Sequence, residues 1–171
     1  GHIASDTVRD LTLLNPVVSG YAQVAGVAGV MEGSVILNCH VVNGTISGTD
    51  EQVGGICGKA SSGTNKILYC TASGSVASAI NTAGGICAII ENSESVINGC
   101  TNLMTVSSTK IRGGIAGSAK NMTVSNCFNS GWIVSGDAPS AGGIIGYAEN
   151  MTMNRCVNVG HVFGNNNVRN V

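Results

Sequence analysis

Residues 141–164, AGGIIGYAENMTMNRCVNVGHVFG, decide the fold because the chain repeats their pattern. A small residue is followed by Gly-Gly, an apolar residue and another Gly. A polar segment, an alternating run that ends in Cys, and Asn-x-Gly come next. The same pattern recurs at 24–48, 53–78, 83–108 and 112–136, and the second Gly of each pair, or its equivalent, falls at 26, 55, 85, 114 and 143. A fixed period of 29 or 30 residues is typical of stacked repeats, in which each unit packs on its neighbours.

Each unit contains three short apolar segments, separated by Gly, Asn and Ser, that read as strands. The first is Gly-Gly-Ile, as at Gly55-Ile56, the second alternates toward Cys, and the third carries Val or Ile after Cys, as at Val76. One unit of this size cannot bury its apolar face alone, whereas a stack can. We therefore predict an all-β fold, a right-handed parallel β-solenoid with about five coils of three strands each.

The coils are expected to start near residues 24, 53, 83, 112 and 141. Residues 1–9 are expected to be a tag remnant and lead-in, and residues 10–171 a single solenoid domain that is a fragment of a longer protein. The net charge is −1 and only 10% of residues are charged, which argues against nucleic acid and anionic membranes as partners. No apolar run approaches the ~18 residues that span a bilayer, so no membrane insertion is expected.

Five of the seven cysteines occupy the same position in the repeat, so stacking should place them in one column: Cys39, Cys70, Cys100, Cys127 and Cys156. Neighbouring side chains in such a column lie about 4.8 Å apart and nearly parallel, a poor geometry for disulfides, so we interpret the column as buried free thiols. Cys57 and Cys87 share a second position in adjacent coils. A redox or metal pair is an alternative there, although apolar neighbours favour simple packing. No pair of cysteines has the C-x2-C spacing of a zinc site, so we expect no metal and no cofactor.

An asparagine column is expected two residues after Cys, formed by Asn102, Asn129 and Asn158. Stacked asparagines can bond to one another through their side-chain amides while satisfying backbone groups at a corner. The sequence therefore predicts a structural ladder here.

The candidate ligand-contact patch is aromatic. Trp132 and His161 share the position five residues after Cys, and Tyr147 and Phe128 fall in nearby columns. A Trp that points out of a flat β-wall can stack on a sugar ring or anchor a protein partner. The alternative is that it shields a corner or packs on an adjoining module.

No catalytic site is expected. Asp50, Glu51 and Asp137 fall at the same corner but in different coils, with no base between them, so they are interpreted as a solvated edge. The sequence contains no metalloprotease, nucleophile-elbow or phosphate-loop motif. The chain is therefore predicted not to be an enzyme.

The recurring glycine pattern resembles the GLUG motif. The resemblance is carried by residues 54–58 (GGICG), 113–117 (GGIAG) and 142–146 (GGIIG), while Ala88 replaces the last Gly of the third copy and Ala25 the first Gly of the first copy. It implies a modular segment of a large exported or cell-surface bacterial protein. Such segments occur in adhesin-like proteins and in the non-catalytic regions of IgA-cleaving metallopeptidases. The resemblance implies no catalytic residues.

Together these features predict an extracellular structural or adhesive module that acts as a rigid spacer or binding wall. Its expected partners are a host glycan or protein, or neighbouring domains of the same chain, and end-to-end self-association through open coils is a further option. The alternative functions are an accessory non-catalytic domain of a secreted peptidase and a divergent carbohydrate-active β-helix.

Overall fold

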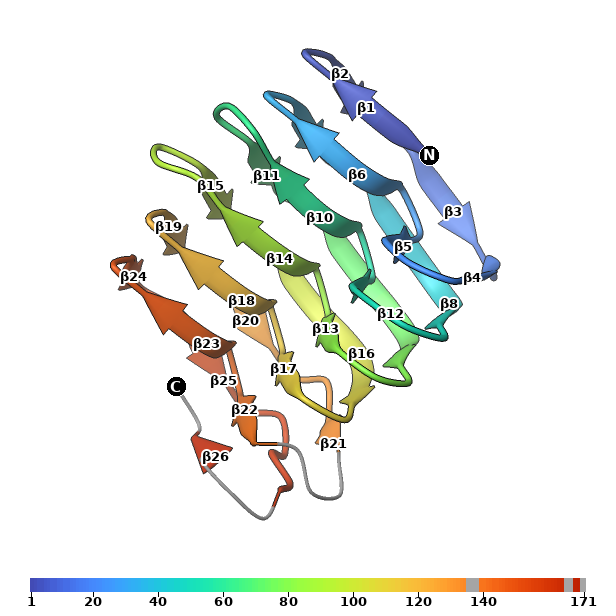
Figure 1. Ribbon diagram of the computed structural model, residues 1–171, viewed down its shortest axis with the longest axis vertical. Helices are drawn as coiled ribbons and strands as arrows, with labels where there is room; N and C mark the ends of the chain where they lie inside the picture. The colour runs from blue at the N-terminus through green and yellow to red at the C-terminus, as the bar shows by residue number, and fades with distance from the viewer. Residues whose placement is uncertain (135–138, 165–167, 170–171) are drawn as a thin grey trace.

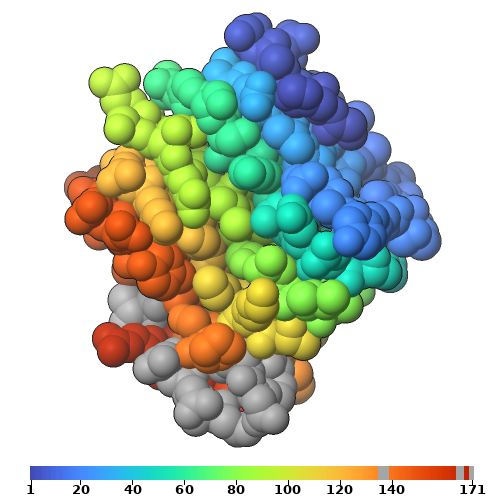
Figure 2. Space-filling view, viewed as in Figure 1, coloured from blue at the N-terminus to red at the C-terminus, as the bar shows by residue number. Residues whose placement is uncertain are grey.

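A computed structural model describes residues 1–134, 139–164 and 168–169, and within them the chain is a parallel β-solenoid without a helix. Figure 1 shows successive coils side by side, from the blue N-terminal end to the red C-terminal end, and Figure 2 shows them as bands across the surface. About six turns of about 29 residues are stacked, and every strand pairs in parallel with its equivalent in the next coil. The predicted all-β parallel solenoid is confirmed.

The strands form four sheets, here called A to D, which each full coil crosses in turn. Sheet A contains β1 (His2–Ala4), β6 (Ala28–Glu32), β10 (Cys57–Ser61), β14 (Cys87–Glu91), β18 (Ala116–Lys120) and β23 (Ile145–Glu149). Sheet B contains β2 (Thr7–Arg9), β7 (Val35–Leu37), β11 (Lys66–Leu68), β15 (Val96–Asn98), β19 (Thr123–Ser125) and β24 (Thr152–Asn154). Sheet C contains β3 (Thr12–Leu14), β4 (Val17–Gly20), β8 (His40–Gly48), β12 (Thr71–Ser78), β16 (Thr101–Ser108), β20 (Phe128–Asn129), β21 (Ile133–Val134) and β25 (Val157–Asn158). Sheet D contains β5 (Val24–Ala25), β9 (Val53–Gly54), β13 (Thr82–Gly84), β17 (Ile111–Gly113), β22 (Ser140–Gly142) and β26 (Val168–Arg169).

The structure corrects the predicted number of strands per coil, which is four sheet positions rather than three. The Gly-Gly-Ile segment, expected as a strand, is the bend between sheets D and A: β13 ends at Gly84, and β14 begins only at Cys87. The backbones of adjacent coils approach closely at this bend. A Cβ atom at Gly85 would lie 2.2 Å from the carbonyl oxygen of Gly114 in the next coil. Glycine is required because only a residue without a side chain allows this approach.

Residues 1–9, expected as tag remnant and lead-in, contain the first strands of sheets A and B. β1 pairs with β6 and β2 pairs with β7, both in parallel. Ile3 and Val8 are partly buried against the core. The solenoid therefore includes strands before the five coils that the repeat pattern indicates.

The corner between sheets B and C is made by one residue in a left-handed conformation, immediately before the cysteine position. The φ angles are 51° at Asn38, 54° at Tyr69, 66° at Gly99 and 53° at Asn126. Asn and Gly tolerate positive φ better than other residues, which accounts for their presence at three of these four corners. The turn directs the following cysteine inward.

The core lies between the sheets and consists of columns of equivalent side chains. Ile36, Ile67 and Ile97 are fully buried in sheet B and stack in register, and Val124 continues the column. Period-2 alternation accounts for this, because successive residues of a strand point to opposite faces. The described part of the chain contains no helix that could cross a membrane.

Candidate functional site: an aromatic cluster beside a groove

The outer face of sheet C contains the clearest candidate for a binding surface. Its long strands alternate, so that Val106 and Ile133 point into the core while Thr105 and Trp132 point outward. The outward column contains Thr45, Ser75 and Thr105 in three successive coils. Trp132 follows Thr105 in this column because Val106 pairs with Ile133. The sheet thus presents small side chains over three coils and then a large aromatic ring.

Three aromatic rings lie together at the C-terminal side of this face, and we call them the aromatic cluster: Trp132, His161 and Phe163. The ring centroids of Trp132 and His161 lie 5.4 Å apart in an edge-to-face arrangement. The Phe163 ring lies 5.8 Å from that of His161 and 6.1 Å from that of Trp132. Such pairs stabilise one another beyond the apolar area that they bury. Trp132 remains 53% exposed and Phe163 47% exposed, so the cluster is held in place yet offers apolar surface to a partner.

The structure separates the four residues of the predicted patch. Trp132 and His161 are in contact. Tyr147 lies on β23 in sheet A, where its hydroxyl donates to Glu149 over 3.1 Å and the Lys120 ammonium lies 5.5 Å from its ring centroid. Phe128 lies on sheet C, but in the column of Thr101 and Val157, and it makes none of the ring contacts that define the aromatic cluster.

Phe163 is the member of the cluster that sequence reasoning missed. The signal was available, because Val162 is a core position and alternation then places His161 and Phe163 on the same outer face. The parallel bridge between Ile133 and Val162 sets this register.

A groove of about 700 Å³ runs along the corner between sheets C and D and ends beside the aromatic cluster. Its lining comes from three successive coils and the start of a fourth: Ser47, Gly48, Thr49, Ala77, Ser78, Ala79, Ser107, Ser108, Thr109 and Val134. All of the lining residues are uncharged, and all except Val134 are Gly, Ala, Ser or Thr. Ser107 pairs with Val134, which is two residues after Trp132 on the same strand face. We call this feature the corner groove.

The floor of the corner groove is braced by hydrogen bonds from hydroxyl groups to turn carbonyls. The Ser78 hydroxyl donates to the Glu51 carbonyl over 2.7 Å, and the Ser108 hydroxyl donates to the Ile111 carbonyl over 2.8 Å. Thr109 donates to the Ile80 carbonyl, also over 2.7 Å. The bonds of Ser78 and Thr109 join adjacent coils, and the bond of Ser108 closes the turn in its own coil, so together they give the groove a fixed shape.

A buried arginine connects the groove region with the aromatic cluster. Arg112 is 0% exposed and occupies a core column whose neighbours are Ala83 and Ala141. Its Nη1 donates to the Ser108 carbonyl over 3.0 Å, and its Nη2 donates to the Phe163 carbonyl over 3.4 Å. Burial lowers the pKa of Arg112. Its Nε has no hydrogen-bond partner among the described residues. Small side chains on both sides leave room for the guanidinium, which fixes the backbone of Phe163.

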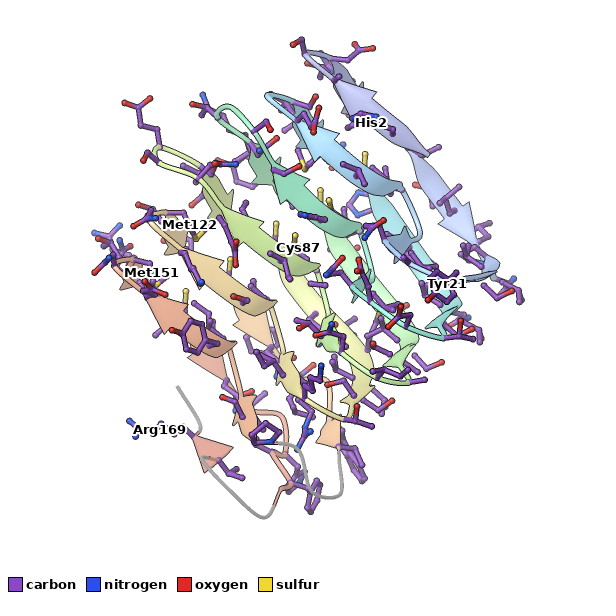
Figure 3. All side chains as sticks on the ribbon, viewed as in Figure 1. His2, Tyr21, Cys87, Met122, Met151 and Arg169 are labelled. Carbon is purple, nitrogen blue, oxygen red and sulfur yellow. The ribbon has the colours of Figure 1, made fainter. Side chains whose placement is uncertain are left out.

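The cysteine positions form a continuous column of free thiols inside the corner between sheets B and C. The backbone nitrogen of Cys39 donates to the Cys70 sulfur over 3.5 Å, and that of Cys70 donates to the Cys100 sulfur over 3.4 Å. The first four members are buried, and Cys156 is partly exposed. Cys57 and Cys87 pair across sheet A, both fully buried, between Ala28 and Ala116 (Cys87 is labelled in Figure 3).

The asparagine column forms a hydrogen-bonded ladder. The Asn102 side-chain amide donates to the Asn129 Oδ1 over 2.7 Å, and Asn129 donates to the Asn158 Oδ1 over the same distance. Each asparagine also closes its own turn. Asn129, for example, accepts from the backbone nitrogen of Gly131 over 3.1 Å and donates to the Gly131 carbonyl over 3.2 Å. The ladder positions the Gly131 turn, and Trp132 follows directly.

The acidic corner lies near the other end of the groove. Asp50 and Glu51 are in the turn after β8, where the Gln23 side-chain amide donates to Glu51. A hydrogen bond to Asp50 raises the pKa of Tyr21. Asp137, the third member of the predicted edge, lies outside the described residues. In the described ranges, no three His, Cys, Asp or Glu side chains lie close enough together to hold a metal ion.

Fold and site together define a parallel β-solenoid with an aromatic cluster at the end of a neutral groove. Comparison of the chain with known protein families, with curated proteins and with solved structures finds no match.

Proposed function

We propose that this chain is a non-catalytic, adhesive repeat module of the GLUG type. In this proposal it is part of a protein exported to the surface of a bacterium, and it binds a neutral glycan along the corner groove. The observation that carries the proposal is the half-exposed ring of Trp132 beside an uncharged, hydroxyl-containing groove. Sugar rings have apolar faces that stack on indole and hydroxyl rims that hydrogen-bond to small polar side chains. The extracellular location and the non-catalytic role rest on the resemblance of the glycine motifs.

The rigidity of the solenoid supports the same function. Its groove is built from strands that pair over several coils and from turns joined by hydrogen bonds, so little order has to be gained on binding. A preformed wall of this kind can bind a flexible polymer while it also separates neighbouring domains. The spacer role and the binding role are therefore compatible in one module.

Replacing Trp132 by alanine is expected to weaken glycan binding by about ten- to a hundredfold, because central aromatic anchors often contribute 2 kcal/mol or more to binding. A glycan array should first identify ligands of the wild type, and isothermal titration should then compare the two proteins. Tyr147→Ala is the matched control, since Tyr147 is 42% exposed on sheet A, away from the aromatic cluster. Equal affinities for wild type and Trp132→Ala would contradict the proposal.

Filling the groove tests the second half of the site. Ala77 is half-buried on the outer face of β12 and lines the corner groove. Ala77→Arg should reduce affinity at least tenfold because the long side chain occupies the space in which we place the glycan, while the aromatic cluster stays intact. Lys59→Ala, on sheet A, serves as the control substitution. Unchanged glycan affinity in Ala77→Arg would show that the groove takes no part in binding.

A protein ligand is the second candidate, favoured by the exposed apolar surface of Trp132 and Phe163. The same variants separate the two cases. If the array yields no glycan ligand, but the module binds a host protein through Trp132, the adhesive role stands and the ligand class changes.

A further inference from the structure

The thiol column repeats one geometry from coil to coil. The cysteine sulfurs make the same two contacts in successive coils. Cys127 Sγ lies 3.2 Å from the Ser125 carbonyl in its own coil and 3.9 Å from the Ile97 carbonyl in the previous coil. Cys156 Sγ lies 3.4 Å from the Asn154 carbonyl and 3.8 Å from the Val124 carbonyl. Repetition of these contacts means that consecutive sulfurs are related by the translation between coils, which is about 4.8 Å.

This spacing is too long for a disulfide and suits a metal ion held between two sulfurs. Metal–sulfur bonds are about 2.3 Å long, so two of them in line span about 4.6 Å. Ions that prefer tetrahedral or octahedral coordination need more than two ligands. Within the described residues, no three His, Cys, Asp or Glu side chains lie close enough together to hold a metal ion. Soft ions with a filled d shell accept two thiolates in a linear arrangement, and thiolates select such ions over hard ones.

We infer that Cys127 and Cys156 bind one soft, two-coordinate cation of the cuprous type between consecutive coils. Binding forms two metal–sulfur bonds and breaks two S–H bonds. Both protons go to solvent, and no electrons are transferred, so the ion stays monovalent. The product carries one negative charge.

The position of Cys156 provides the access that a buried pair lacks. Cys127 is only 2% exposed, but Cys156 is partly exposed, so an ion can reach the column through it. Cys57 and Cys87 pair across sheet A and are 0% exposed, with Ala28 and Ala116 in the column on either side. The other consecutive pairs of the thiol column, from Cys39 to Cys127, are buried as well, so Cys127 and Cys156 form the pair with a partly exposed member.

Binding of the ion displaces the thiol proton of Cys127 and the thiol proton of Cys156. Since both protons are released, affinity for the ion rises with pH.

The test is an anaerobic titration of the full chain with Cu(I) complexed to bicinchoninate, a coloured competitor that reports the ion it retains. Wild type should withdraw a first equivalent of Cu(I), and withdrawal should be stronger at pH 8 than at pH 6. Cys156→Ser should lower the affinity at least tenfold. This residue is partly exposed, so the variant should fold, and its circular dichroism spectrum verifies that. Cys87→Ser is the matched control and should leave the first equivalent in place.

X-ray absorption of the one-equivalent complex gives an independent measure, with two sulfur neighbours in line as the expected result. The inference is overturned if wild type withdraws no Cu(I), if Cys156→Ser withdraws it as well as wild type, or if the ion has three or more ligands.

Discussion

Asn129→Ala should lower the free energy of unfolding by about 4 kcal/mol. The Asn129 side chain is fully buried and makes four hydrogen bonds, two to neighbouring asparagines and two to Gly131. Removing it leaves buried partners unsatisfied, and each of these costs about 1–3 kcal/mol, partly offset by local relaxation and water. Urea unfolding followed by circular dichroism measures the change.

The control for this variant is Asn154→Ala, at an exposed position in β24. That substitution should change stability by less than about 0.5 kcal/mol. If Asn129→Ala costs no more than Asn154→Ala, the amide ladder does not stabilise the solenoid, and the stacking of coils at this corner has another origin.

The second large effect is expected at the glycine corner between sheets D and A. A Cβ atom at Gly114 would lie 2.1 Å from the Gly143 carbonyl oxygen and 2.4 Å from the Asn129 side chain. Neither neighbour can move without shifting a coil, so Gly114→Ala should cost about 3 kcal/mol or more. The expected result is a much lower urea midpoint or the loss of the strand spectrum.

Gly33→Ala separates this steric effect from the intrinsic preference of glycine. Gly33 has a φ of 51°, and a Cβ atom there would meet nothing closer than 3.9 Å. Its replacement should therefore cost only about 1–2 kcal/mol, the usual penalty for a left-handed conformation. Equal losses in the two variants would mean that the coils do not approach as closely at Gly114 as the fold requires.

The repeat pattern predicted the architecture because each coil repeats its own inward and outward positions. The columns of Cys100 and Cys127 and of Asn102 and Asn129 follow from the period alone, once the coils are parallel. The corners were harder to predict. A glycine pair such as Gly84-Gly85 looks the same in a strand and in a bend, and only the distance to the neighbouring coil distinguishes the two.

The candidate site could be predicted only in part. Trp132 and His161 lie at equivalent repeat positions, so the period brings them together. Tyr147 lies on a different sheet. The sequence does not show where the corner between the two sheets falls, so the repeat period alone could not separate Tyr147 from Trp132. Arg112 gave no signal, since an arginine in an alanine column reads as an exposed residue until its neighbours are known to leave room for it.

Equivalent residues of successive coils lie directly over one another, and a distance along the stack measures this arrangement. Leu14 and Val159 are 68% and 62% exposed in one outward column of sheet C, five coil steps apart. Spin labels at Leu14→Cys and Val159→Cys, in a Cys156→Ser background, should give a narrow distance distribution near about 24 Å, five steps of about 4.8 Å. A mean distance far from this value, or a broad distribution, would contradict the stacked-coil account.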